Sequence, residues 1–252
     1  MCLLALFYRV VEDAAVVVGA NREELYRRGG EPPHLHDGPP RFVAGVDPVA
    51  GGTWLGVNEH GVLAAVTNRA KDRRPDRPRS RGLLVRDLLA CASAAEAGKL
   101  AVSELNADRY DGCNIVCADA QSAVLIHGTD WLRVRPLPPG LHVLTNGDVN
   151  DERDARLTFV AHLLGQEGYR YRSSADCIQV LRQLCGRHEP GEPAVCLTGD
   201  DRGTTSSSIV ALRGSLAEGV YLHAQGPPDR TPYEDYSGLL REMAGERGAS
   251  AP

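Results

Sequence analysis

The start of the chain constrains the fold more than any other stretch. Residues 3–11 form an almost unbroken apolar run, residues 12–13 are Glu and Asp, and residues 14–18 are apolar and β-branched again. This pattern predicts a hairpin of two buried strands with a tight turn at residues 12–13. In such a hairpin the positions of facing residues sum to about 25, give or take two for the type of turn. Residue 2 is therefore expected beside residues 22 and 23.

The expected pairing places Cys2 beside Arg22 and Glu23. We expect an aminopeptidase to remove Met1, because cysteine is small enough to follow the cut. The Cys2 amine, with a pKa of roughly 7.7–8.0, can then act as a base for its own thiol. Arg22 would favour the thiolate, and Glu23 would orient the ammonium group, which together predict an N-terminal nucleophile. The alternative is that Cys2 is a small apolar residue at the start of a buried strand.

Composition bounds the class of protein. With 252 residues, 42% of them hydrophobic, we expect a single domain over residues 1–252, with a polar, frayed tail after about residue 227. The net charge of −5 gives no electrostatic reason to expect a nucleic-acid partner. The seven cysteines form no CxxC pair and no zinc spacing, which indicates a reducing, cytoplasmic compartment. The apolar start is too short for a membrane span and is not a secretory signal. No cofactor is expected, and no particular oligomeric state is predicted.

Patterns along the rest of the chain predict strands, helices, strands, helices and strands in turn. The expected strands are residues 54–58, 62–67, 113–117, 123–127, 132–134, 141–145, 203–212 and 219–224. The expected helices are one beginning near Gly82 after a Ser80 cap, a second one separated from it at Gly98, and residues 152–166 and 175–185, the last capped by Ser173 or Ser174. Hairpin connections without β-α-β alternation indicate an α+β fold of two antiparallel sheets packed face to face with helices outside.

Two further stretches are expected to be loops. Residues 29–41 are rich in Gly and Pro, and although His34, His36 and Asp37 could form a metal cluster, no further ligands are indicated and a solvated loop is favoured. Residues 69–81 carry seven Lys or Arg residues and are expected to be exposed and mobile. The alternative for this stretch is an electrostatic collar for an anionic substrate carrying a phosphate or a carboxylate.

Seven short motifs follow one another over nearly the whole chain. They are Met1-Cys2, Ala-Asn-Arg-Glu-Glu at residues 20–24, Gly-Gly-Thr-Trp-Leu-Gly-Val-Asn at 51–58, Thr-Asn-Arg at 67–69, Ser-Arg-Gly-Leu-Leu at 80–84, Leu-Thr-Asn at 144–146 and Gly-Thr-Thr-Ser-Ser-Ser at 203–208. Each is weak alone. In this order and at this length, they resemble the NRDE family, named for an Asn-Arg-Asp-Glu motif and also known as the transport and Golgi organisation protein 2 homologues.

The NRDE family is similar to cysteine-type N-terminal nucleophile hydrolases such as penicillin V acylase and bile salt hydrolase. The resemblance implies a four-layer αββα sandwich in which Cys2 is nucleophile and base and Arg22 is its electrostatic partner. It also implies that Asn68 donates to an oxyanion and that Asn146 orients the Cys2 amine or the tetrahedral intermediate. Both asparagines follow a predicted strand, and a turn asparagine in the left-handed conformation is the alternative for each.

Two positions depart from the family pattern. Glu23 stands where the motif has aspartate, which is one methylene shorter, and Thr205 stands where relatives commonly have arginine. We keep Glu23 among the catalytic candidates. The matched motifs also make Trp54, Arg69, Thr205 and Ser206 the candidates for substrate binding.

These residues predict a hydrolase that cleaves a linear amide, or a related acyl bond, of a small molecule. The alternative is a binding or carrier protein that holds an apolar anionic ligand, such as haem or an acyl lipid, without turnover. Threonine at position 205 fits this alternative, although the chain has no c-type haem attachment sequence. Reactivity separates the two, because a catalytic Cys2 should react with electrophiles far faster than Cys91 or Cys185.

Overall fold

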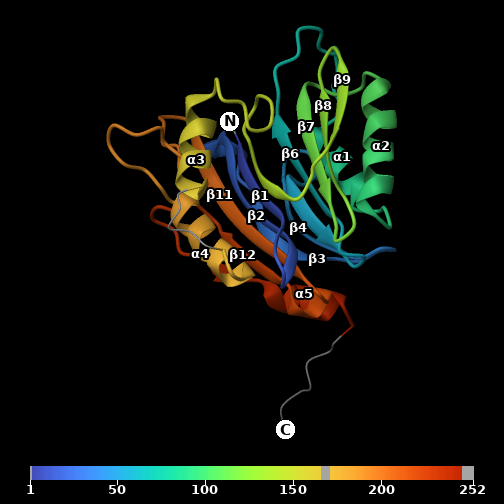
Figure 1. Ribbon diagram of the computed structural model, residues 1–252. Helices are drawn as coiled ribbons and strands as arrows, with labels where there is room; N and C mark the ends of the chain where they lie inside the picture. The colour runs from blue at the N-terminus through green and yellow to red at the C-terminus, as the bar shows by residue number, and fades with distance from the viewer. Residues whose placement is uncertain (1, 166–170, 246–252) are drawn as a thin grey trace.

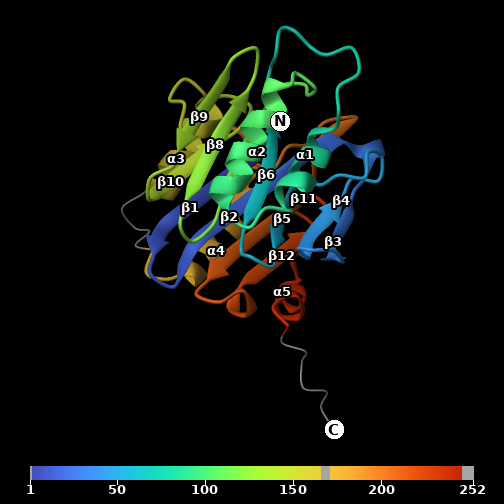
Figure 2. The same ribbon diagram turned by 90° about the vertical axis from the view of Figure 1, so that its right-hand side faces the viewer.

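Two antiparallel sheets pack face to face between two layers of helices, which confirms the expected four-layer α+β sandwich. The computed structural model describes residues 2–165 and 171–245, and Figure 1 shows the four layers side by side. One sheet has six strands in the order β10-β1-β2-β11-β12-β13, and the other has seven in the order β3-β4-β5-β6-β7-β8-β9. Helices α3 and α4 cover the six-stranded sheet, whereas α1 and α2 cover the seven-stranded sheet, as Figure 2 shows from the side.

The elements have the following bounds. The six-stranded sheet consists of β1 (Leu3–Val11), β2 (Ala14–Leu25), β10 (Gly140–Leu144), β11 (Arg202–Arg213), β12 (Val220–Ala224) and β13 (Glu234–Asp235). The seven-stranded sheet consists of β3 (Glu31–His36), β4 (Phe42–Val46), β5 (Leu55–Asn58), β6 (Leu63–Asn68), β7 (Cys113–Ala118), β8 (Ala123–Gly128) and β9 (Leu132–Pro136). The helices are α1 (Arg81–Leu88), α2 (Ala94–Asn106), α3 (Ala155–Gly165), α4 (Ser174–Cys185) and α5 (Ser237–Met243), with short 3-10 turns η1 (Tyr26–Arg28) and η2 (Leu216–Glu218).

The hairpin at the start of the chain forms as expected. Leu3 faces Asn21 and Leu4 faces Ala20, and a register shift between Tyr8 and Val11 accounts for the offset of one residue from the turn. Because successive residues of a strand point to opposite sides of a sheet, the side chains of β1 are buried alternately in two apolar layers. The next facing pair after Leu3 and Asn21 joins residue 2 to residue 22, within the range that the sequence predicts.

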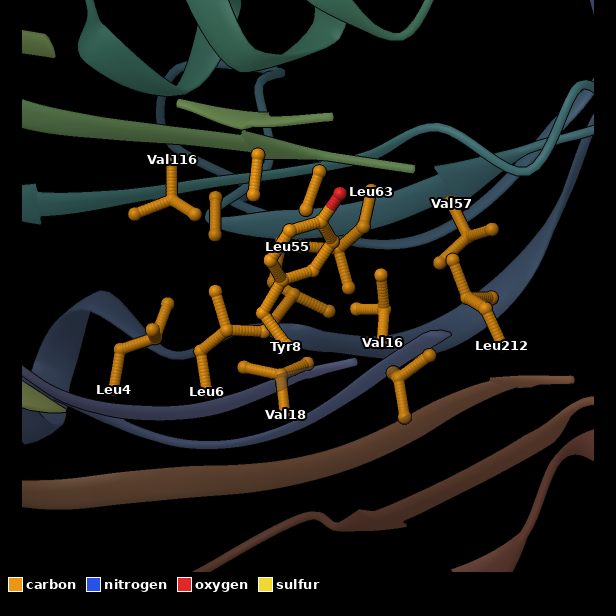
Figure 3. Close-up of a cluster of buried hydrophobic side chains, with 14 of the residues drawn as sticks. Leu4, Leu6, Tyr8, Val16, Val18, Leu55, Val57, Leu63, Val116 and Leu212 are labelled. Atoms are coloured by element: carbon orange, nitrogen blue, oxygen red, sulfur yellow. The ribbon is translucent and has the colours of Figure 1, made fainter. Parts of the chain in front are cut away.

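Three apolar layers hold the sandwich together. The central layer lies between the sheets, where β1 and β2 contribute Leu4, Leu6, Tyr8, Val16 and Val18 and the facing sheet contributes Leu55, Val57, Leu63 and Val116 (Figure 3). The two outer layers lie under α3 and α4 and under α1 and α2. Burial of each large side chain contributes roughly 1.5–3 kcal/mol, so each sheet is stabilised on both faces.

The predicted helix caps are confirmed. The Ser80 hydroxyl accepts a hydrogen bond from the backbone N–H of Gly82 at the start of α1. Ser173 forms a capping box with Asp176 at the start of α4. Each cap satisfies backbone donors that the first turn of a helix leaves unpaired. The helix expected at residues 152–166 begins three residues later, and residue 166 lies outside the described ranges.

Three expectations about local structure are wrong. Part of the predicted loop at 29–41 is β3, which pairs with β4 at the edge of the sheet, where proline is tolerated. The two helices expected after Ser80 do form, but residues 89–93 separate them and Gly98 lies inside α2. A Cβ at Gly98 would come within 2.9 Å of Val124, so glycine allows the helix to approach the sheet. In the tail after 227, β13 and α5 form within the described residues up to 245, because Leu240 and Met243 are buried in the central layer.

Close backbone packing at Gly52 gives a first prediction. A Cβ at Gly52 would lie 2.2 Å from the carbonyl carbon of Gly82, where the loop before β5 crosses the start of α1. Gly52→Ala should therefore lower the free energy of unfolding by about 1–3 kcal/mol in urea titrations. Gly238→Ala is the control, because the nearest atom in reach of its Cβ is Arg241 Nη2 at 3.8 Å. Equal stability of the two variants would show that the Gly52 contact relaxes without cost.

Candidate active site

A cavity of about 290 Å³ opens beside the start of β1, between the two sheets and the start of α1. The first sheet contributes Cys2, Arg22 and Glu23 to its wall, and the second sheet contributes Asn68. Trp54 precedes β5, and Arg81 begins α1. Ten of the sixteen lining residues belong to segments that the sequence motifs also mark, namely Met1-Cys2, 20–24, 51–58, 67–69 and 80–84.

Cys2 is the one partly exposed cysteine of the chain, since the other six are buried. Burial raises the pKa of the Cys2 thiol above its usual range, and the charge of Glu23 raises the pKa further. The backbone N–H of Glu23 and the guanidinium of Arg22 lower the pKa, but they do not outweigh burial. Arg22 thus acts on the pKa of the thiol in the expected direction, and burial opposes it.

Arg22 is a largely buried cation on the cavity wall. Its Nη1 donates to the carbonyl oxygen of Gly29 at 2.6 Å and to Thr205 Oγ1 at 3.2 Å. Its guanidinium carbon lies 4.5 Å from the centroid of the Trp54 ring, a cation–π distance. Burial lowers the pKa of Arg22, because removing a guanidinium from water disfavours its charge. Arg22 makes no ion pair with Asp or Glu among the described residues.

Trp54 fits beside Arg22 because the neighbouring backbone carries glycine. A Cβ at Gly45 would lie 2.8 Å from Trp54 Cη2, and one at Gly30 would lie 3.3 Å from both Trp54 and Arg22 Nη1. Side chains at these two positions would push the indole ring or the guanidinium away. The ring therefore forms a fixed wall of the cavity.

Thr205 and Ser206 do not line this cavity. Thr205 is the extra residue of a β-bulge in β11, since Thr204 faces Glu23 and Ser206 faces Arg22. The Thr205 hydroxyl accepts from Arg22 Nη1 and donates to the Arg22 carbonyl oxygen at 3.2 Å. Ser206 Oγ is buried without a hydrogen-bond partner in the described ranges. Thr205 therefore holds Arg22 in place, and the substrate contact expected of Thr205 and Ser206 stays a prediction.

Glu23 forms an ion pair with Arg156 of α3, a residue that the sequence did not single out. Arg156 Nη2 lies 2.5 Å from Glu23 Oε1 and donates to the carbonyl oxygen of Val195 at 2.7 Å. Burial raises the pKa of Glu23, and the hydrogen bond and charge of Arg156 oppose the rise. The sequence does mark Arg156, because it is the one Lys, Arg, Asp or Glu residue within the otherwise uncharged α3.

The two candidate asparagines occupy different places. Asn68 ends β6 and lines the cavity, whereas Asn146 is not part of its wall. The chain around Asn146 is tied to β7, because Asn114 Nδ2 donates to the carbonyl oxygens of Thr145 at 3.3 Å and Gly147 at 3.2 Å. Asn146 Oδ1 is buried and accepts no hydrogen bond from the described residues. The sequence did not identify Asn114, which anchors this loop.

Arg69 contacts the loop after Asn146 and is not part of the cavity wall, so its expected substrate role stays a prediction. Its guanidinium donates to the Gly147 carbonyl oxygen and to Asp148 Oδ1, the latter at 2.8 Å. Its Nη1 also lies 3.3 Å from His127 Nδ1, and that nitrogen lies 2.7 Å from Asn114 Oδ1. These contacts brace the loop against β7 and β8.

The basic stretch at 69–81 is tied down by several ion pairs. Lys71 is buried and lies 2.5 Å from Asp108, and Arg79 lies 2.6 Å from Asp87. Of its seven cationic residues, Arg79 and Arg81 line the cavity. Only these two arginines of the stretch could therefore contribute to the electrostatic collar that was the alternative for it.

A metal or membrane role finds no support in the described ranges. Over residues 2–165 and 171–245, no group of three or more His, Cys, Asp or Glu residues is placed to hold a metal ion. The rings of His34 and His36 contact each other with centroids 4.1 Å apart and planes tilted by 33°. None of the described helices is long and apolar enough to cross a membrane.

The architecture is that of the N-terminal nucleophile hydrolases. The chain superposes on the N-acylethanolamine-hydrolyzing acid amidase ortholog of Caenorhabditis elegans with a TM-score of 0.57 and 17% identity, covering 82% of this chain and 92% of that one. It superposes on penicillin V acylase from Agrobacterium tumefaciens with a TM-score of 0.57 and 14% identity, covering 95% and 88%. At these identities the likeness establishes the fold alone.

The sequence defines the family to which the chain belongs. The profile of the Transport and Golgi organisation 2 family matches residues 1–189, so the chain belongs to that family, and the resemblance seen in the motifs is confirmed. The mouse Transport and Golgi organization 2 homolog is 30% identical over 142 residues, which are 52% of this chain and 50% of the mouse protein. The human homolog is 30% identical over 111 residues, 43% of this chain and 40% of the human protein. The matches thus span about half the length of these relatives or less.

Proposed function

We propose that the protein is an N-terminal cysteine amidohydrolase that cleaves a linear amide, or a related acyl bond, of a small molecule. One observation carries the proposal: the partly exposed Cys2 shares a cavity wall with the buried cation of Arg22 and with Asn68. A nucleophile, a cation and an amide donor at one cavity are the groups that acyl transfer requires.

The proposed reaction begins after removal of Met1. As the Cys2 sulfur bonds to the substrate carbonyl carbon, its proton passes to the Cys2 amine, because the raised thiol pKa leaves little thiolate beforehand. Asn68 Nδ2 donates to the oxyanion, and the Arg22 cation stabilises its charge. The tetrahedral intermediate collapses when the C–N bond breaks and the Cys2 ammonium protonates the leaving amine. Water then attacks the thioester, releasing the acid and restoring the thiol.

Two further residues support this site. We assign Glu23, which is part of the cavity wall and is held by Arg156, to orienting the Cys2 amine. We assign Asn146 to the same amine or to the intermediate, since its side-chain oxygen is buried without a partner in the described part of the chain. Both groups would act by positioning reacting atoms.

The test is the intact mass of the purified protein before and after brief exposure to limiting iodoacetamide at neutral pH, with peptide mapping. We expect loss of Met1 and modification at Cys2, because the other six thiols are buried. Cys2→Ala should abolish the labelling, whereas Cys91→Ala, at a buried position, should leave it unchanged. Retained Met1, or labelling spread over several cysteines, would overturn the proposal and favour the ligand carrier.

A further inference from the structure

Some charges on the cavity wall are compensated within the protein. Arg28 lies 2.7 Å from Asp47, and both residues line the cavity. Arg79 lies 2.6 Å from Asp87, a residue of α1. An ion pair of this kind exerts little electrostatic attraction on a ligand, because the fields of its two charges largely cancel at a distance. These arginines are therefore not the groups that attract a substrate.

Two guanidinium groups on the same wall lack such compensation. Neither Arg22 nor Arg81 forms an ion pair with Asp or Glu over the described residues. Asp111 also lines the cavity, but its carboxylate lies 3.5 Å from Arg74 and accepts the backbone N–H of Gly112 at 2.7 Å. Of the other carboxylates on the wall, Glu24 lies 3.6 Å from Arg28 and Glu23 is paired with Arg156. The charges of Glu24 and Asp47 also act on Arg22, so Arg81 is the cation of the wall that is left for an anion of the ligand.

The two cations serve different parts of the cavity. Arg22 is next to Cys2 across the β1–β2 pair, so its charge acts on the sulfur and on the oxyanion formed there. Arg81 is the first residue of α1, and the close contact of Gly52 with Gly82 fixes the backbone beside it. Arg81 is therefore available to bind a part of the substrate that takes no part in the reaction.

The free edge of Arg81 indicates the chemistry of that group. Nη1 donates to the Gly112 carbonyl oxygen at 2.9 Å, whereas Nε and Nη2 make no hydrogen bond to the described residues. The Nε and Nη2 hydrogens point in parallel, a geometry that matches the two oxygens of a carboxylate. A volume of about 290 Å³ is at the small end for a ligand site, so the part of the ligand that this cavity holds is compact.

We propose that Arg81 is a specificity residue that binds a carboxylate of the substrate, so that the preferred substrates are compact amides or thioesters bearing a carboxylate. This inference rests on the proposed function of Cys2. The carboxylate docks on the Nε–Nη2 edge of Arg81, and the reacting carbonyl lies at Cys2. Neutral analogues lose this contact and are poorer substrates.

The test uses reagents that modify Cys2 and differ in one charge. Rate constants for 3-maleimidopropionate and the neutral 3-maleimidopropanamide are measured at Cys2 by mass spectrometry with peptide mapping, for the mature protein and for Arg81→Gln. We expect the ratio of acid to amide rates to fall roughly five- to tenfold in Arg81→Gln. The rate with iodoacetamide should stay within about twofold, because the thiol itself is unchanged.

Arg86→Gln is the matched control. Arg86 is an exposed arginine of the same helix whose Nη1 donates to the Gly51 carbonyl oxygen, and it is not part of the cavity wall. We expect its acid-to-amide ratio to equal that of the unmodified sequence. An unchanged ratio in Arg81→Gln, or an equal fall in both variants, would overturn the carboxylate site.

A second measurement separates this inference from the proposed function. If Cys2 does not react with iodoacetamide, the nucleophile proposal fails, and binding is then measured with Cys2→Ala protein. Glutarate should raise the melting temperature of this protein more than glutaramide at matched ionic strength, and Arg81→Gln should remove the difference. Equal effects of glutarate and glutaramide would overturn the carboxylate site independently of catalysis.

Discussion

Replacing Arg156 with methionine is expected to lower the free energy of unfolding by about 3–5 kcal/mol. The Glu23 side chain is 2% exposed and that of Arg156 is 9% exposed, so the ion pair is shielded from water. Methionine fills similar space but leaves the Glu23 carboxylate without its guanidinium partner. The measurement is urea or guanidinium unfolding at pH 7, followed by circular dichroism.

Two further variants show whether the charge is responsible. Arg153→Met removes an arginine that is 86% exposed and paired with Asp151, so it should change the free energy of unfolding by less than about 1 kcal/mol. The double variant Glu23→Gln with Arg156→Met should recover much of the loss, because it removes both buried charges. An Arg156→Met protein as stable as Arg153→Met would contradict the assignment of a buried ion pair.

The pH dependence gives an independent check with a definite sign. Burial raises the pKa of Glu23, and the hydrogen bond and charge of Arg156 oppose this rise. Arg156→Met removes that opposition. A carboxyl whose folded pKa exceeds its unfolded value of 4.5 destabilises the protein as pH rises through that range. The deficit of Arg156→Met should therefore be full at pH 7 and smaller at pH 5.

The same buried pair supports the site, because Glu23 is the neighbour of Arg22 on β2. Its negative charge raises the pKa of the Cys2 thiol, so the Glu23 side chain acts on the reactivity of the sulfur. Glu23→Gln should thus alter the pH profile of Cys2 alkylation, which a purely structural ion pair would not do. Aspartate at position 23, as in the family motif, would reach one methylene less far toward Arg156.

The part of the site nearest the chain start follows from local sequence. The apolar runs on either side of residues 12–13 define two strands and a turn, and a strand period of two then fixes which residues face each other. This reasoning places Cys2 beside Arg22 without any knowledge of the rest of the chain. Likewise, Ser80 and Ser173 act within one helical turn, so a short motif is sufficient to predict them.

The rest of the site depends on contacts between distant segments, for which the sequence has no local pattern. Arg156 and Glu23 are 133 positions apart, and Arg69 reaches Asp148 across 79 positions. For the same reason α5 was missed: its polar sequence resembles a tail, and only the space between the sheets makes Met243 a buried residue. Sheet edges and helix docking sites exist only after the two sheets have paired.

Acidification should destabilise the protein between about pH 6.5 and pH 4 through two buried histidines. Burial, followed by the charge of Arg69, lowers the pKa of His127 to about 4. Arg133 and Arg135 add to this effect, whereas Asp148, whose Oδ1 lies 3.6 Å from His127 Nε2, opposes it. Since that network braces the loop carrying residue 146, its protonation affects the candidate site as well as stability.

The second histidine lies on the other sheet. His223 is buried on β12, where its Nδ1 lies 2.9 Å from Ser208 Oγ and its Nε2 lies 2.8 Å from Gln225 Oε1. Burial lowers the pKa of His223 to about 4, and the Gln225 hydrogen bond opposes the shift. His127 and His223 therefore add two similar contributions to the dependence of stability on pH.

The sign follows from the direction of both shifts. Below the ordinary histidine pKa of 6.5 the unfolded chain binds protons that the folded chain excludes, so stability falls until the folded value of about 4 is reached. A shift of this size corresponds to about 3 kcal/mol for each fully buried histidine. His127→Gln should roughly halve the slope of unfolding free energy against pH, whereas His60→Gln, at an exposed position, should leave it unchanged. A flat stability profile between pH 6.5 and 4 would mean that the folded protein admits these protons, and that the Arg69 network opens before the sheets do.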